Sequence, residues 1–331
     1  MFRWHRIKAL VIRHMYLYQR SLPRLMDVFF WPTMDLLVWG FLSLYLEKLA
    51  LGNFNIVSVL LGAVIFWGML QQSQGSVSTT FLEDVWEKNF LNLFVTPLSI
   101  AEFLAATTIL VFIRVVLGLV VISLLAFFFY NFNFLIFGLA AIPFLVNLIL
   151  FGCTLGFLIT VVIFRYGTSA QVLAFGFIFL IQPFSAVFYP VSALPSSMQF
   201  VSYLLPSTYV FEGMRSLLNG GIFDMRYALY GFGLNILYFI LTLVLFFWVF
   251  RWAAERALHV LIAACIGVAK HWLKAAGKHQ PLDAYENFNK LAELQVISLE
   301  ELKQWRKVIG MRNALVHDYL ASASEKIPHC Q

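Results

Sequence analysis

Long apolar runs separated by short polar segments fill the first 250 residues of the chain. As helices with a rise of about 1.5 Å per residue, these runs are long enough to cross about 30 Å of hydrocarbon. We therefore expect an all-α fold, with a polytopic membrane protein of six transmembrane helices followed by a short soluble C-terminal helical module. The six spans are predicted near residues 28–50, 56–79, 100–130, 134–163, 169–190 and 227–251.

An amphipathic pattern precedes the first span. Over residues 2–20, apolar side chains from Trp4 to Tyr18 share one helix face, and arginines occupy the opposite face. This pattern indicates a helix that lies in the membrane surface. A basic flank that only sets the orientation of the first span is the alternative.

A second amphipathic stretch, FLEDVWEKNFLNLFVTPLS at residues 81–99, separates the second and third spans. Its charges cluster in the first half, Pro97 ends the element, and Ser99 is suited to cap the next helix. We predict that a partner outside the membrane moves the spans through this stretch, and a merely solvated loop is the alternative. The predicted coupling residues are Phe81, Glu83, Asp84, Trp86, Glu87 and Phe90.

Prolines and glycines mark two further features of the spans. Four prolines between Gln182 and Arg215 predict a broken, partly re-entrant hairpin on the outer side. In the fourth span, Gly152 and Gly156 form a small-xxx-small surface that suits close helix packing, although glycine is also tolerated in lipid.

Two charged residues lie inside apolar spans, Asp35 in the first and Arg114 in the third. A charge at that depth is costly and usually faces a partner or a cavity. We expect the two residues to pair for structural reasons, and a role in the transport path is the alternative.

The composition agrees with a membrane protein. The chain is 61% hydrophobic and 12% charged, with a mean hydropathy of +0.82. Its net charge is +6, and six Lys and Arg residues precede the first apolar run. This cluster of basic residues indicates membrane orientation rather than nucleic-acid binding. The three cysteines have neither disulfide nor zinc-ligand spacing, so no metal site is expected.

The composition changes after Arg251 and divides the chain into a membrane domain, 1–252, and a cytoplasmic helical module, 253–331. The module is much richer in charge than the spans, with ten Lys and Arg and eight Asp and Glu. Its pattern predicts helices over 254–276 and 284–294, and a third that begins at a capping box of Ser298 and Glu301 and runs to about Leu320.

The third helix of this module ends in the sequence RNALVHDY. Arg312 and Tyr319 share one helix face, and Asn313 and His317 lie four residues apart on a neighbouring face. Such a cluster suits binding of an RNA phosphate and proton transfer near neutral pH. Compensation of the helix dipole by Arg and His is the alternative.

The membrane domain resembles the type-2 ABC transporter permeases over about residues 1–250. The resemblance is carried by the N-terminal amphipathic helix, by LFVTPLS and by PFSAVFYPVSALPSSMQFVSYLLPSTYVFEGMR. It implies a homodimer in the lipids of a bacterial plasma (inner) membrane, with both termini cytoplasmic, that exports drugs, lipids or glycans. It also implies a separate ATPase subunit docked on 81–99. The chain has no G-x-x-x-x-G-K-[ST] loop, so we expect it to bind no cofactor itself and the partner to use the ATP.

The C-terminal module resembles the HEPN-type toxin ribonucleases of toxin–antitoxin pairs over about residues 255–320. Their R-x-x-x-x-H motif matches Arg312 and His317, which the resemblance makes catalytic, with Asn313 at the RNA phosphate. Tyr319 matches the tyrosine that a nucleotidyltransferase antitoxin modifies with AMP. The family's first and closing helices have no counterpart, so we expect a truncated, fused and inactive fragment.

Three functions therefore compete. The leading one is an exporter permease with the module as a passenger. A membrane-tethered HEPN-type ribonuclease acting through RNALVHDY would require cleavage of RNA that depends on Arg312 and His317. A simple channel would show transport that is independent of any ATPase.

Overall fold

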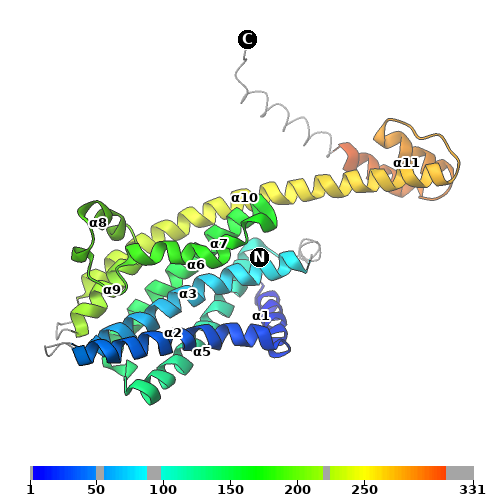
Figure 1. Ribbon diagram of the computed structural model, residues 1–331. Helices are drawn as coiled ribbons and strands as arrows, with labels where there is room; N and C mark the ends of the chain where they lie inside the picture. Colours follow the sequence, from blue (N-terminus) through cyan, green and yellow to red (C-terminus); the bar gives the residue numbers. More distant parts are fainter. Residues whose placement is uncertain (1–2, 50–55, 88–97, 219–223, 311–331) are drawn as a thin grey trace, which may run out of the picture. The chain divides into compact units, whose positions relative to one another are not determined.

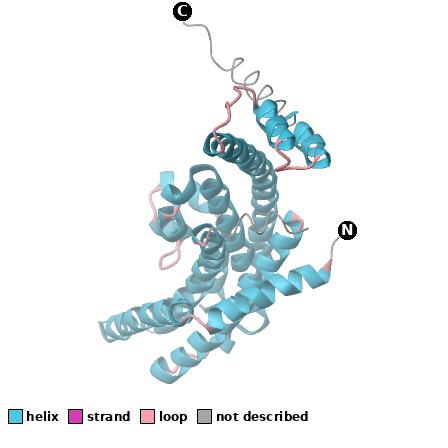
Figure 2. Cartoon of the chain, turned by 90° about the vertical axis from the view of Figure 1, so that its right-hand side faces the viewer, coloured by secondary structure: helices cyan, strands magenta, loops and turns pink. Residues whose placement is uncertain are grey.

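The computed structural model describes residues 3–49, 56–87, 98–218 and 224–310, and every regular element in these ranges is a helix (Figure 1 and Figure 2). The all-α expectation is thereby confirmed. The chain forms two compact units, Met1–Val249 and Phe250–Gln331, which are described separately.

The first unit is a helical bundle preceded by the short helix α1, Trp4–Gln19. Four regions contain its long apolar helices: α2 (Leu22–Leu49), α3 (Ile56–Trp86), α5 (Ile100–Tyr130) and α6 (Ala141–Tyr166), the last entered through η1 (Phe134–Ala140). The shorter elements η2 (Gly167–Ala170), α7 (Val172–Ile181), η3 (Gln182–Ser185), η4 (Val191–Ala193), α8 (Ser196–Tyr203) and α9 (Pro206–Leu218) follow. The helix α10, Met225–Ala275, begins in this unit and ends in the second.

Six helical stretches in the described residues are long and apolar enough to cross a membrane, but they are not all the six predicted from the sequence. The predicted span at 169–190 is wrong as a single helix, because α7 has 10 residues and ends at Ile181. Pro183 then begins a 3₁₀ turn, and Ala186 adopts a left-handed conformation with φ 50°, so the α-helix cannot continue. The sixth apolar stretch is instead Leu258–Ala275, inside the predicted soluble module.

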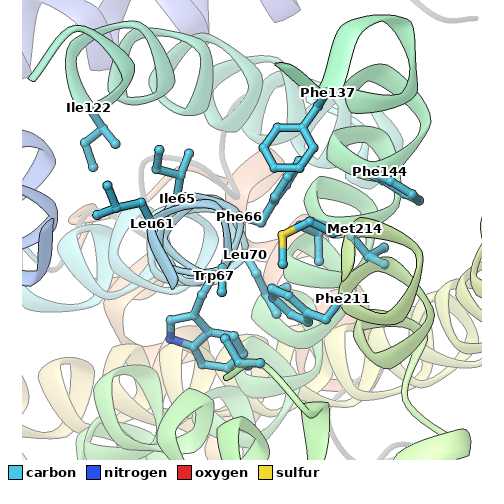
Figure 3. Close-up of a cluster of buried hydrophobic side chains, with 14 of the residues drawn as sticks. Leu61, Ile65, Phe66, Trp67, Leu70, Ile122, Phe137, Phe144, Phe211 and Met214 are labelled. Carbon is cyan, nitrogen blue, oxygen red and sulfur yellow. The ribbon is translucent and has the colours of Figure 1, made fainter. Parts of the chain in front are cut away.

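The core of the first unit is built around the middle of α3. Phe66 lies among aromatic side chains of η1 and α6, with ring centroids 5.1 Å from Phe137 and 6.2 Å from Phe144. Figure 3 shows these rings on one side of α3 and Trp67 nearer to Phe211 of α9. Because α3 is covered on several sides, apolar side chains recur around its whole circumference rather than along one stripe.

The small-residue surface of α6 is confirmed as a close-packing surface. A Cβ atom at Gly152 would lie 2.8 Å from the Leu70 carbonyl oxygen of α3, and one at Gly156 would lie 3.0 Å from the Gln74 carbonyl oxygen. Both distances leave no room for a side chain, so the two glycines set the distance between the α6 and α3 backbones.

The second unit has a small core of its own. Ile262, Ile266 and Leu273 of α10 pack with Phe288 of α11 (Ala284–Glu293), and with side chains of a helix over 299–310. The Phe288 ring stacks on Trp305, with centroids 4.3 Å apart. The helices predicted over 254–276 and 284–294 are confirmed.

The predicted capping box of this unit is also confirmed. The Glu301 backbone N–H donates to the Ser298 hydroxyl over 3.2 Å, and the Ser298 N–H donates to Glu301 Oε2 over 2.7 Å. These bonds to Ser298 lower the pKa of the Glu301 carboxyl.

Candidate coupling site

The helix α3 continues to Trp86, beyond the predicted end of the second span near residue 79, and its last two turns are packed into the bundle. The Phe81 ring lies edge-on to Phe164 of α6, with centroids 4.4 Å apart. Phe81 is almost fully buried, in a cluster with Ile159 and Ala174. Apolar contacts to α6 and α7 therefore extend the helix through the first part of the predicted coupling stretch.

The acidic side chains at this end of α3 are paired with arginines near the N-terminus. Arg13 Nη2 lies 2.9 Å from Asp84 Oδ1, and the Asp84 side chain is only 1% exposed. Arg24 Nε lies 3.0 Å from Glu83 Oε1, and Arg24 Nη2 donates to Glu87 Oε1 over 3.0 Å. Three of the predicted coupling residues thus hold the end of α3 to the helices α1 and α2.

Trp86 differs from its acidic neighbours because half of its side chain, 50%, is exposed. Its indole N–H donates to Gln171 Oε1 over 3.2 Å, which orients the ring without covering it. Of the predicted coupling residues, Phe90 lies outside the described residues, and Phe81 and Asp84 are buried. The coupling role itself stays a prediction, and Trp86 is the side chain best placed to touch a partner.

Ser99 caps the helix α5, as the sequence predicts, and Glu102 completes a capping box with it. The Glu102 backbone N–H donates to the Ser99 hydroxyl over 3.2 Å, and the Ser99 N–H donates to Glu102 Oε2 over 2.9 Å. The same carboxylate also accepts the backbone N–H of Arg3, over 2.7 Å, and Arg6 Nη1, over 3.4 Å. Glu102 is fully buried and caps the starts of α1 and α5 together.

Arg114 belongs to the same region, but not in the way the sequence suggests. Its guanidinium lies 3.8 Å from the centre of the Tyr18 ring of α1, a cation–π contact. No ion pair joins Arg114 to Asp35 in the part of the chain that the structure describes, and Asp35 is exposed on α2. The expected pairing of these two charges is therefore wrong in this structure, because Arg114 is buried against Tyr18 whereas Asp35 is exposed on the surface of α2.

His14 is a buried titratable group on the face of α1 that packs against the bundle. Burial, opposed by the Asp84 carboxylate and aided by nearby arginines, lowers the pKa of His14 to about 4. The imidazole, only 2% exposed, is therefore neutral near pH 7. The sequence offers no signal for this, because a histidine in an amphipathic helix is usually assigned to the polar side.

The segment between Gln182 and Arg215 forms a broken helical region at the start of α9, as the prolines predict. Arg215 Nη1 donates to the Ala186 carbonyl oxygen over 2.8 Å, and its Nη2 donates to Glu212 over 3.0 Å. Glu212 in turn accepts the Val191 backbone N–H over 2.7 Å. One ion pair thus satisfies backbone groups that a continuous helix would have satisfied itself.

The remaining predicted site residues, Arg312, Asn313, His317 and Tyr319, lie outside the described residues. Sequence reasoning missed three residues that the structure brings to the end of α3 and the start of α5. Arg13 and Arg24 appear in the sequence as an orientation signal, and Glu102 appears as part of an apolar helix. The only available signal was the match of an arginine-rich N-terminus to an acidic cluster beyond the second span.

Comparison with protein families gives two matches that divide the chain. The model of the ABC-2 type transporter matches residues 5–219, well over half of the chain, and the model described as ribonuclease HepT-like matches residues 248–329. No curated protein matches the chain. ABC-2 permease domains typically work with an ATPase subunit. The chain is therefore a membrane protein of the ABC-2 type transporter family, with a HepT-like ribonuclease domain at its C-terminal end.

Proposed function

We propose that the chain is the membrane subunit of an ATP-driven exporter and that a separate ABC ATPase docks at the end of α3. The observation that carries this proposal is Trp86, an exposed aromatic ring held in place at the end of an otherwise buried helix. Exposed, oriented aromatic side chains are the residues most often found at the centre of protein interfaces. The cargo is an amphipathic molecule of the drug, lipid or glycan class.

The experiment is co-expression with a bacterial ABC ATPase subunit of the kind that partners ABC-2 permease domains, followed by purification of the complex in lipid nanodiscs. Trp86→Ala should reduce co-purified ATPase about tenfold or more, as expected for a central aromatic residue. Trp248→Ala is the matched control, because Trp248 is similarly exposed but lies on the apolar part of α10. Equal recovery of the ATPase with both variants would contradict docking at α3.

We further propose that the protein works as a homodimer in a bacterial plasma membrane with both termini in the cytoplasm. The basic residues before α2 support this orientation, since Lys and Arg are enriched on the cytoplasmic side of short flanks. Labelling of single cysteines placed at positions 5 and 279 in intact cells would test it. Access for an impermeant reagent to either position would overturn it.

Ribonuclease activity is the second candidate function, because the HepT-like match includes the RNALVHDY sequence. Arg312 and His317 would act on the RNA phosphate, Asn313 would help to bind it, and Tyr319 would be the target of a nucleotidyltransferase antitoxin. Incubation of RNA with the full chain in nanodiscs tests this. Cleavage that is lost in both Arg312→Ala and His317→Ala would establish ribonuclease activity. Intact RNA would contradict it, and the permease function would then be the only proposed function that remains.

A further inference from the structure

The helix α1 contacts both helix ends that flank the connection from α3 to α5. On the α3 side, Arg13 of α1 pairs with Asp84, and Arg24, in the first turn of α2, pairs with Glu83 and Glu87. On the α5 side, the start of α1 is held by Glu102. We name this set of contacts the N-terminal clasp. Its members are Arg3, Arg6, Arg13, Arg24, Glu83, Asp84, Glu87 and Glu102.

The clasp is held along its whole length and not only at its two ends. The Ile7 side chain is fully buried below α1, and the Tyr18 ring covers Arg114, which lies well beyond Glu102 on α5. Contacts from Arg3 to Tyr18 on one helix and from Glu102 to Arg114 on the other mean that α1 lies along the first half of α5. Figure 1 shows α1 at the end of the bundle where α2 begins.

The chemistry of the clasp makes its contacts specific. Asp84 and Glu102 are carboxylates removed from water, so each depends on its donors for the stability of its charge. The Glu102 carboxylate serves both helices, because its Oε1 accepts the Arg3 N–H at the start of α1 and its Oε2 accepts the Ser99 N–H at the start of α5. A displacement of α1 away from the start of α5 therefore breaks a hydrogen bond to a buried carboxylate.

We propose that the N-terminal clasp makes the end of α3 and the start of α5 move as one body, so that force received at the end of α3 also reaches the start of α5. Asp84 and Glu102 are its positioning residues. This inference rests on the proposed docking of an ATPase, and it assigns to α1 a part in carrying the motion.

Hydrogen exchange measured on the full chain in nanodiscs with its ATPase, with and without ATP and vanadate, tests the proposal. In Glu102→Ala, amide exchange over 4–19 should rise about tenfold or more, since a charge-assisted hydrogen bond to a buried group is lost. The nucleotide-dependent change in exchange over 182–218 should disappear, although the KM of the complex for ATP is unchanged. Arg13→Ala should have the same effects, and Arg13→Lys should restore the nucleotide response.

Glu47→Ala is the matched control, because Glu47 is an exposed carboxylate on α2, and it should behave as the unsubstituted chain. Slow exchange over 4–19 in Glu102→Ala would overturn the clasp. Fast exchange over 4–19 together with an unchanged nucleotide response over 182–218 would show that the clasp exists but does not transmit the motion. A missing nucleotide response in the unsubstituted chain would instead contradict the proposed ATPase coupling, and the exchange of α1 would still decide whether the clasp exists.

Discussion

Among the described residues of the membrane unit, two clusters of buried charges can be compared, and their contacts have different roles. In the N-terminal clasp, each pair joins residues that are far apart in the sequence and belong to different helices. In α9, Glu212 and Arg215 are three positions apart, and they bind backbone groups of the broken segment before α9. The first arrangement joins separate helices to each other, whereas the second supplies hydrogen bonds to backbone groups of a broken helix.

The largest effect is expected for Arg215→Ala. It removes the donor to the Ala186 and Val187 carbonyl oxygens and leaves the partly buried Glu212 without its cation, at a cost of about 3 kcal/mol. Hydrogen exchange should accelerate over 182–195 and remain unchanged over 4–19. Arg226→Ala, which breaks an exposed pair with Asp224, should change neither segment. Faster exchange of α1 in Arg215→Ala would mean that the two charge clusters are not independent.

The reciprocal result is expected for Asp84→Ala, which should weaken the docking of α1 by about 2 kcal/mol. The reason is that Arg13 then loses its buried acceptor and retains Glu87 at 4.0 Å. Exchange over 4–19 should rise, and exchange over 182–195 should not. An effect on both segments would contradict the independence of the N-terminal clasp and the Glu212–Arg215 pair.

Acidification should loosen the clasp through His14. The pKa of His14 in the docked helix, about 4, lies below the ordinary value of 6.5, so the undocked helix binds a proton more readily. As the pH falls from 6.5 to 4, the free energy that favours docking of α1 therefore decreases by about 1.4 kcal/mol per pH unit. Docking is fully retained above pH 6.5. Exchange over 4–19 at pH 7 and pH 5, corrected for the intrinsic rate, measures this. In His14→Gln the difference should vanish, and a difference that persists would assign it to another group.

The smallest effect concerns the two charges that the sequence suggested as a pair. Arg114 contacts Tyr18 and not Asp35. The losses of membrane-inserted protein in Asp35→Asn and Arg114→Gln, expressed as free energies, should therefore add within about 0.5 kcal/mol in the double variant. The combination of Arg114→Gln with Tyr18→Leu should be less than additive, because both changes remove one contact. Additivity in this second cycle would show that the cation–π contact contributes nothing.

Local features were predictable from the sequence, and features that depend on distant contacts were not. The cap at Ser99 and the capping box at Ser298 depend on residues only three positions apart, and the packing of Gly152 and Gly156 needs a fixed spacing on one helix. The length of α7 was overestimated because hydropathy does not report the left-handed turn at Ala186.

The clasp could not be derived from the sequence for a different reason. Arg13 and Arg24 serve equally well as orientation signals and as ion-pair partners, and only the fold decides between these uses. The burial of Asp84 and Glu102 follows from the docking of α1, which no local pattern specifies. The roles of Arg312 and His317 stay predictions.

The close packing of α6 against α3 gives the long helix a fulcrum. The contacts of Gly152 and Gly156 centre near Gln74, which lies closer to Trp86 at one end of α3 than to Ile56 at the other. At a rise of about 1.5 Å per residue, the arm to Trp86 measures about 18 Å and the arm to Ile56 about 27 Å. If α3 tilts as a rigid rod about this contact, a sideways displacement of the Trp86 end appears at the Ile56 end in the opposite direction, enlarged about 1.5-fold by the ratio of these arms. The clasp would lie on the shorter arm of such a tilt.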